Sequence, residues 1–319
     1  MNNDLILGIK TQKGAVAPTI LEGVTWETER KGVPGKLYFK CLFDRNNIFE
    51  EGDLITVKYK GNKIFYGFIF SMNRDKNNII SVVAYDQLKY LKNKDVFRYE
   101  NKKASEVIKI LAEDFKLQIG DIEDTGFIIP KRLEDNVSIF DIILTALGIT
   151  LQNTKKMYIL YDDFGKLTLK DVEKMKLDIL IDNGTSENFS YKSSIENSAN
   201  QIKLVKSDEK AGKREIYIAK DSSNINKWGV LQHFDKIDEK ENGEMKADAL
   251  LKLYNRKFKT LNIKNTFGDT RVRAGSSVIV NLDLGDIKVK NYMLVEKVKH
   301  TFKFQEHFMD LTLRGADIQ

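Results

Sequence analysis

The most constraining feature of the sequence is a run of alternating apolar and polar residues between Arg271 and Arg314. It divides into three segments, and glycines at Gly275 and Gly285 supply the positive φ that the connecting turns need. Period-two alternation is typical of antiparallel strands with one buried and one wetter face. We therefore expect three strands here. Their expected inward positions are Val278, Val280, Leu282, Tyr292, Leu294, Val298, His300, Phe302, Met309, Leu311 and Leu313.

The same pattern occurs near the N-terminus, between Gly52 and Ala84. When Gly52 is aligned with Gly275, a short strand, a turn, a longer strand and a closing strand follow in the same order in both copies. The aligned pairs are Ile55 with Val278, Val57 with Val280, Tyr59 with Leu282, Ile80 with Met309, Val82 with Leu311 and Ala84 with Leu313. A duplicated unit has to be recognised before the fold is assigned, because it changes the architecture expected for the whole chain. It predicts two β-units of one plan at opposite ends of the chain.

Between the two β-units the apolar residues change to the spacing of amphipathic helices. One helix is expected to begin near Ala104, and a second to begin after Ser138, which is placed to cap it with Asp141 three residues on. A β-hairpin with the turn D-D-F-G follows. The fold class we expect is α+β, mainly β. The expected domains are residues 1–97, a small α+β domain of two helices plus a hairpin at 98–177, and 178–319, with a helix near 243–259 and an inserted exposed region near 206–232.

Charge and cysteine usage narrow the function classes. The 52 basic and 46 acidic residues leave a net charge of +6, without a clustered basic face. The nearest candidate, Lys252 to Lys259, is more typical of a solvated helix surface, so we expect no specific nucleic-acid binding. Cys41 is the single cysteine, and neither a signal peptide nor a membrane anchor is evident. These features fit a protein made in a reducing cytoplasm.

Catalytic and metal-binding motifs are missing from the sequence. Acid pairs at Asp162-Asp163 and Glu50-Glu51 lie at turns, where Asp and Glu more often bond to the backbone than act as an acid and a base. His300 and His307 flank a turn next to Glu306, but an ordinary zinc site needs three or four ligands, so a structural role is favoured. We expect no enzyme activity, no catalytic residues, no cofactor and no metal.

The stretch from Ala247 to Val280, followed by V-E-K-V-K-H-T-F and H-F-M-D-L-T-L, resembles the C-terminal part of XkdQ-like phage tail proteins. E-G-D-L-I-T-V, the segment Gly67–Ile69 and V-V-A-Y-D-Q-L-K-Y-L resemble their N-terminal part. That family comprises baseplate hub proteins of contractile phage tails and of tail-like (R-type) bacteriocins, and is related to the hub part of type VI secretion spikes.

The resemblance implies a homotrimer in which each chain carries two tube-like split β-barrel domains. It implies a structural hub that joins a six-fold tail tube protein to a three-fold central spike protein, beside neighbouring baseplate or wedge proteins and the tape-measure protein. The protein would then be made in a bacterial cytoplasm and become part of a phage tail baseplate or of a released tail-like particle. A non-catalytic nucleic-acid or glycan binding module built on small barrels stays open as the alternative, and a tail-associated hydrolase is a third reading.

Two regions are expected to form interfaces. The Gly/Pro-rich connection between Arg30 and Lys36 is longer than a hairpin needs, so it is a candidate for the tube-facing contact, although a mobile loop without a partner fits equally. Edge pairing between neighbouring units points to the second β-unit. The candidate interface residues are Gly32, Val33, Pro34, Gly35, Val278, Val280, Leu282, Tyr292, Leu294 and Val298.

Overall fold

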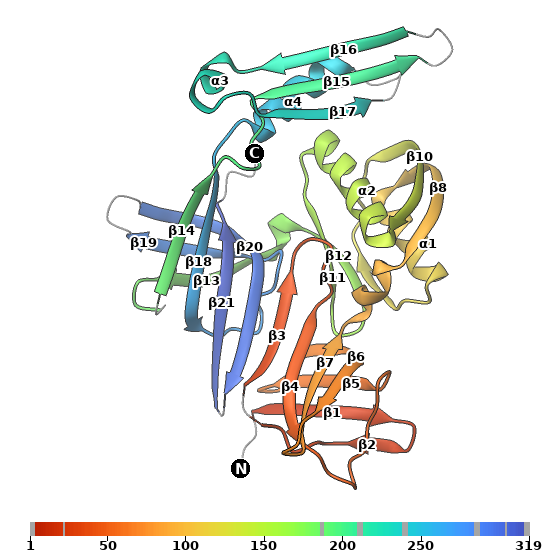
Figure 1. Cartoon of the computed structure of the whole chain (residues 1–319), viewed down its shortest axis with the longest axis vertical. Helices are drawn as coiled ribbons and strands as arrows, with labels where there is room; N and C mark the ends of the chain where they lie inside the picture. The colour runs from red at the N-terminus through yellow and green to blue at the C-terminus, as the bar shows by residue number, and fades with distance from the viewer. Residues whose placement is uncertain are drawn as a thin grey trace. The chain divides into compact units, whose positions relative to one another are not determined.

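The chain folds into two units, which we call the main unit and the inserted unit (Figure 1). The computed structural model describes residues 4–21, 23–185, 188–208, 213–237, 242–283, 288–303 and 305–315. The main unit is built from Met1–Ser190 and Asn262–Ala316, and the inserted unit from Tyr191–Leu261. The inserted unit at Tyr191–Leu261 is longer than the exposed region expected near 206–232, and the domain bounds 1–97, 98–177 and 178–319 stay a prediction.

Most strands belong to one 13-stranded sheet, in the order β14-β18-β21-β20-β3-β4-β7-β6-β5-β1-β2, with β13 paired to β19 and β19 to β20. The pairs along the path from β20 to β2 are antiparallel, whereas β13 and β19 are parallel. Across the described residues this path has two ends. The strands are β1 (Leu5–Thr11), β2 (Gly14–Val16), β3 (Val24–Glu29), β4 (Lys36–Leu42), β5 (Leu54–Tyr59), β6 (Asn62–Arg74), β7 (Ile79–Tyr85), β13 (Lys176–Asp182), β14 (Asn188–Ser194), β18 (Phe258–Phe267), β19 (Ser277–Asp283), β20 (Lys288–Lys303) and β21 (Glu306–Arg314).

The sheet contains the predicted repeat. The order β4-β7-β6-β5 in the first β-unit matches β18-β21-β20-β19 in the second. The aligned glycines, Gly52 and Gly275, share a φ of 93°. Each donates its backbone N–H to the long strand, to the carbonyl of Ile69 or Val295, at 2.8 Å. The long strand returns a bond in both units, to the residue that follows the glycine. The two β-units thus share hydrogen-bonding detail as well as strand order.

An irregularity of the second long strand corrects one sequence expectation. The register of β20 against β21 shifts between Val295 and Lys297, so Glu296 is an extra residue. A bulge reverses the inside–outside parity of a strand. Met293 and Val295 are therefore buried although the alternation had them outside, and Leu294 is buried on the opposite face. The first unit has the same shift in β6, between Ile69 and Ser71.

The middle of the main unit has the two expected helices and the expected hairpin. The helices are α1 (Ala104–Asp114) and α2 (Ile139–Thr154), and Ser138 caps α2 by accepting the N–H of Asp141. Together with the strands beside them, which Figure 1 shows, they enclose a separate core of buried apolar side chains, known from their burial and contacts. The hairpin is β11 (Tyr158–Asp162) and β12 (Leu167–Asp171), which pairs with β9 (Ile119–Ile122); the other elements are β8 (Lys94–Lys103), β10 (Ile128–Ser138), and the 3-10 turns η1 (Gln87–Lys92) and η2 (Val172–Met175).

The inserted unit is a three-stranded sheet in the order β16-β15-β17. Its strands are β15 (Gln201–Asp208), β16 (Lys213–Lys220) and β17 (Gln232–Ile237), and its helices are α3 (Ser222–Trp228) and α4 (Gly243–Tyr254). The helix expected near 243–259 ends at Tyr254, because β18 begins at Phe258. The turn at Gly285 and the loop at 209–212 lie outside the described residues. Over the part of the chain that the structure describes, no helix is long and apolar enough to cross a membrane.

Candidate interaction surfaces

The connection between β3 and β4 is fixed at both ends. Arg30 donates two hydrogen bonds to the carboxylate of Glu296, at 2.8 and 2.9 Å, and its side chain is 7% exposed. At the other end, the N–H of Gly35 donates to Asp86 Oδ2 at 2.8 Å. A Cβ at Gly35 would lie 2.4 Å from that oxygen, so a larger residue would displace the Asp86 carboxylate. The connection is thus held against the sheet at both ends.

Of the four interface candidates in this connection, only Val33 presents a substantial side-chain surface, with 37% exposed. Gly32 is half-buried, and a Cβ at this position would lie 3.5 Å from Cδ1 of Leu144 in α2. Pro34 and Gly35 are buried. A partner protein that binds this connection would therefore contact Val33. The role of the four residues in an interface stays a prediction.

The candidates in the second β-unit lie in the interior of the single chain. The side chains of five of them are at most 1% exposed: Val278, Val280, Leu282, Leu294 and Val298. Tyr292 is half-buried, with the ammonium of Lys176 over its ring. The strand β19 itself lies between β13 and β20. Contacts between chains at this place would have to involve neighbouring strands, and the interface prediction stays untested.

Two buried carboxylates join parts of the main unit. Asp86 accepts the N–H groups of Gly35 and Leu88, and Asp162 accepts the N–H of Gly165 and the side-chain amide of Gln87. Burial, followed by the charge of Asp162, raises the pKa of Asp86 well above its usual range. Burial raises the pKa of Asp162 to about 6. Perturbed carboxyl groups can mark active sites, but backbone and amide donors occupy these, which supports the predicted turn role of Asp162.

Arg273 extends this cluster into the second β-unit. Its guanidinium donates to the carbonyl of Asp162 at 2.8 Å and lies 4.1 Å from the ring centroid of Tyr161. The side chain therefore attaches the turn before β19 to the hairpin β11–β12.

His300 and His307 form a buried pair between strands β20 and β21. His300 Nε2 lies 2.9 Å from the carbonyl of Val272, which only accepts, so Nε2 carries the proton. His300 Nδ1 then accepts the N–H of His307 Nε2 at 2.8 Å. Trp26 of β3 stacks on His300 with ring centroids 4.6 Å apart. Burial, together with its neighbour His307, lowers the pKa of His300 to about 3, and burial lowers the pKa of His307 to about 4.

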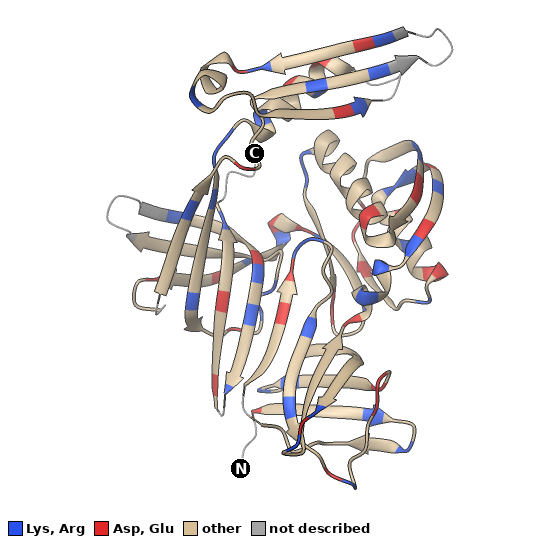
Figure 2. Ribbon diagram, viewed as in Figure 1, with Lys and Arg blue, Asp and Glu red and all other residues tan. Residues whose placement is uncertain are grey.

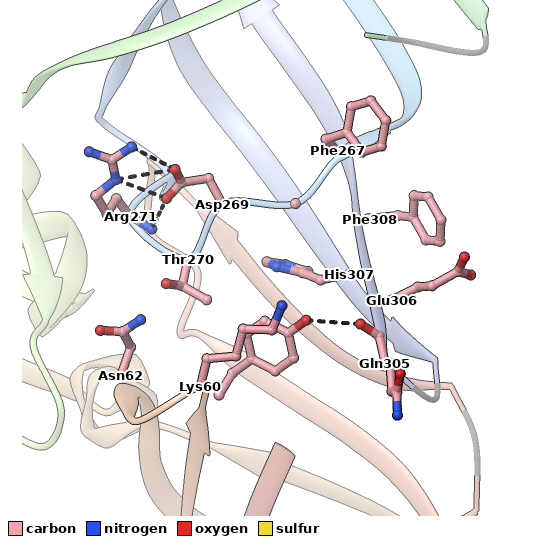
Figure 3. A pocket seen from close by; sticks show the side chains of 12 residues that line it. Lys60, Asn62, Phe267, Asp269, Thr270, Arg271, Gln305, Glu306, His307 and Phe308 are labelled. Atoms are coloured by element: carbon pink, nitrogen blue, oxygen red, sulfur yellow. Dashed lines mark hydrogen bonds and ion pairs between the residues drawn. The ribbon is translucent and has the colours of Figure 1, made fainter. Parts of the chain in front are cut away.

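A surface hollow of about 540 Å³ lies next to this pair, between the two β-units (Figure 3). Phe267 and Phe308 stand on one side of it, and Asp269 is ion-paired with Arg271 on the other. The hydroxyl of Tyr59, from the first β-unit, is 3.4 Å from the carbonyl of Gln305 in the second. Over the described residues, no group of three or more His, Cys, Asp or Glu side chains could hold a metal ion.

Within the described residues, two unpaired strand edges are surface features that alternation alone did not reveal. β14 is the end strand of the main sheet, and none of its seven side chains is buried. The second half of β6, Ser71–Arg74, pairs with β7 on one side only, because the pairing of β5 with β6 ends at Phe68. Unpaired edges are templates for another strand.

Comparison with known proteins finds relatives over most of the chain. Residues 24–314 match the YQBQ-like family model. The chain is 30% identical to the YqbQ protein of Bacillus subtilis strain 168 over 302 residues, which is 92% of this chain and 91% of that protein. It is 31% identical to XkdQ, a protein of the phage-like element PBSX of the same strain, over 267 residues, 82% and 81% of the two chains.

Solved structures show the same fold. The 43 kDa tail protein of prophage MuSo2 from Shewanella oneidensis superposes with a TM-score of 0.71 at 11% identity, over 98% of this chain and 99% of that one. The Escherichia coli protein c3393, a component of the type VI secretion system, gives 0.58 at 9% identity, over 98% and 77%. At these identities the likeness concerns the fold alone.

Proposed function

The chain belongs to the YQBQ-like family, and we propose that it is the trimeric hub of a phage tail baseplate, joining a six-fold tail tube to a three-fold spike. The proposed role is that of a structural protein of phage tail and baseplate type, without enzyme activity. In the proposed trimer each β-unit acts as a tube-like split barrel. Three chains with two such units each present six similar surfaces.

The observation that carries the proposal is the junction of the two β-units within one chain. There, β3 at the edge of the first β-unit pairs with the second half of β20, Lys297–Phe302. By the repeat, β14 corresponds to β3, since each lies next to the strand (β18 or β4) that flanks the closing strand. The second half of β6 corresponds likewise to that of β20, because each follows the register shift.

Within the described residues, β14 and the second half of β6 each have one edge without a strand partner. We therefore place the contact between chains where β14 of one chain pairs with Ser71–Arg74 of the next, as β3 pairs with β20 inside each chain. Contacts of this head-to-tail kind close into a ring when the rotation permits. Six junctions, three within chains and three between them, would complete it.

The two β-units differ in one connection, and this difference would give the proposed ring a three-fold feature. The short connection Arg30–Lys36 joins β3 to β4, and the equivalent connection, from β14 to β18, contains the sheet β16-β15-β17 and the helices α3 and α4 of the inserted unit. A ring of six β-units would then carry three short connections alternating with three inserted units. Proposed partners are the tail tube protein on the six-fold side, the central spike protein on the three-fold side, and adjoining baseplate, wedge and tape-measure proteins.

Light scattering of the purified chain over a concentration series tests the trimer. We expect a mass of about three times the 36.7 kDa chain at high concentration. A proline at Ser193, on exposed β14, should reduce trimer formation because proline removes a donor from a strand edge. The matched control is proline at Ala15 on β2, the opposite end of the sheet, and should retain the trimer. Equal loss in both variants would speak against β14.

A further inference from the structure

The sheet of the inserted unit is covered on one face and bare on the other. Ile202 and Leu204 of β15 point toward α4, where they pack with Ala247 and Leu250 and are fully buried. Successive side chains of a strand alternate between faces, so Lys203 and its neighbours two residues away point the other way. The hydrogen bond between Gln201 and Gln232, at 2.8 Å, lies on that second face. We call it the open face.

Large apolar side chains occupy the open face. The pairing register places Ile218 and Phe234 on either side of Lys203, and Ile216 directly opposite Val205. Ile216 is 56% exposed, Ile218 55% and Phe234 53%. Single exposed apolar residues are ordinary, but adjoining ones on a bare sheet face mark an interaction surface.

The charges on the open face have one sign. Lys203, Arg214, Lys220 and Lys236 all point to it, one or two from each strand, as their register with the apolar residues shows. Figure 2 shows Lys and Arg on all three strands. The carboxylates of β16 and β17, Glu215 and Asp235, fall on the opposite face by the same alternation. Within the described residues of the three strands, the open face therefore carries four cations and no carboxylate.

We propose that the open face binds a protein segment that presents aliphatic side chains bordered by carboxylates. The isoleucines would pack against the aliphatic side chains, and the four cations would pair with the acidic border. Single-stranded nucleic acid fits less well, because its bases stack on aromatic rings and Phe234 is the one aromatic side chain among the described positions of this face. A second copy of the same face is disfavoured by repulsion between like charges. The inference does not depend on the trimeric hub.

The test is a titration of the full chain with a short synthetic peptide of alternating leucine and glutamate, followed by fluorescence anisotropy and by hydrogen exchange. We expect binding, with slower exchange in β15–β17. The double variant Lys203→Glu, Lys236→Glu should weaken binding at least tenfold, about 1.4 kcal/mol. Ile216→Thr, Ile218→Thr should weaken it by a similar factor, which separates apolar contact from charge alone. Lys10→Glu, Lys109→Glu, on exposed residues of the main unit, is the matched control and should bind as the unaltered chain does.

Several results would overturn the proposal. They are equal binding of a leucine–lysine peptide, slower exchange outside the inserted unit, and insensitivity to both open-face variants. Tighter binding of oligo-dT, or of vesicles containing phosphatidylglycerol, would assign the face to nucleic acid or to a membrane instead. Circular dichroism of each variant shows whether a loss of binding reflects unfolding. If both open-face variants unfold, protection of β15–β17 by the leucine–glutamate peptide in the unaltered chain decides the matter.

Discussion

At the scale of single residues, Glu296, the extra residue of β20, balances the charge of Arg30. Although burial opposes ionisation, the hydrogen bonds from Arg30 hold the pKa of Glu296 below its usual value. Arg314 approaches the same carboxylate at 3.5 Å. Glu296 thus neutralises a guanidinium that is almost fully buried, and the bulge is what turns its side chain toward Arg30.

Glu296→Ala should therefore destabilise the chain more than the loss of a surface ion pair would. Removing one partner of a buried pair leaves an uncompensated charge, which costs about 3–5 kcal/mol. Glu29→Ala is the control, since its contact with Lys297 spans 3.9 Å between half-exposed side chains, and we expect a loss of less than about 1 kcal/mol. Urea unfolding of the two variants gives the comparison, and equal losses would contradict this role for Glu296.

The histidine pair predicts a loss of stability in mild acid. Both rings are neutral in the folded chain, with pKa values lowered to about 3 and about 4, whereas the unfolded chain binds protons near pH 6.5. As the pH falls from about 6.5 to about 4, the unfolded state takes up more protons than the folded one. The free energy of unfolding therefore falls, by an amount on the order of a few kcal/mol.

The measurement is the urea midpoint between pH 7 and 4 for the unaltered chain and for His300→Gln, His307→Gln. The double variant is expected to be less stable at pH 7 and to show a shallower dependence on pH. Acidic residues contribute to the slope of both proteins, so the difference between them is the result that matters. His233→Gln, in the inserted unit, is the control. Identical slopes for the double variant and the unaltered chain would disprove this account of the pair.

At the scale of elements, the alternation of the sequence found β19, β20, β21 and their N-terminal counterparts, and the helical spacing found α1, α2 and α4. It could not locate the bulge at Glu296, because period two has no signal for one added residue. It also missed the pairing of β8 with β10, whose side chains are mostly exposed and carry little apolar pattern. The buried interface candidates chosen by alternation are core residues, because alternation indicates which side chains are buried. It carries no information on which strand edges lack a partner.

The close approach of β6 to β7 gives a prediction at this scale. A Cβ at Gly67 would lie 2.3 Å from the carbonyl oxygen of Tyr85, a backbone atom that cannot rotate away. Gly67→Ala should thus separate the strands and cost about 1–3 kcal/mol. In Gly8→Ala the nearest atom is 3.8 Å from the new methyl group, so this control should be neutral or slightly stabilising. Thermal unfolding compares the two, and equal midpoints would show that β6 and β7 are not this tightly packed.

At the scale of the whole molecule, the duplicated β-unit accounts for the proposed assembly. One chain contains a finished junction, β3 with β20, and the two halves of an unfinished one, β14 and the second half of β6. A ring of three chains would finish every junction with the same geometry. The strand order from which the ring is proposed could not be predicted from the sequence, because the strand that pairs with an edge strand can lie hundreds of residues away in the chain.

The most direct test of the ring is a disulfide between its proposed neighbours. Lys192→Cys on β14 is combined with Ser71→Cys or Asn73→Cys on β6, all at exposed positions, whereas the native Cys41 is buried. Lys192→Cys with Lys13→Cys, beside β2, is the control. After mild oxidation, one or both β14–β6 pairs should give covalent species of two and three chains and nothing larger, with the control left as single chains. A ladder that continues beyond three chains, or the absence of any β14–β6 disulfide at concentrations where the protein is trimeric, would contradict the closed ring.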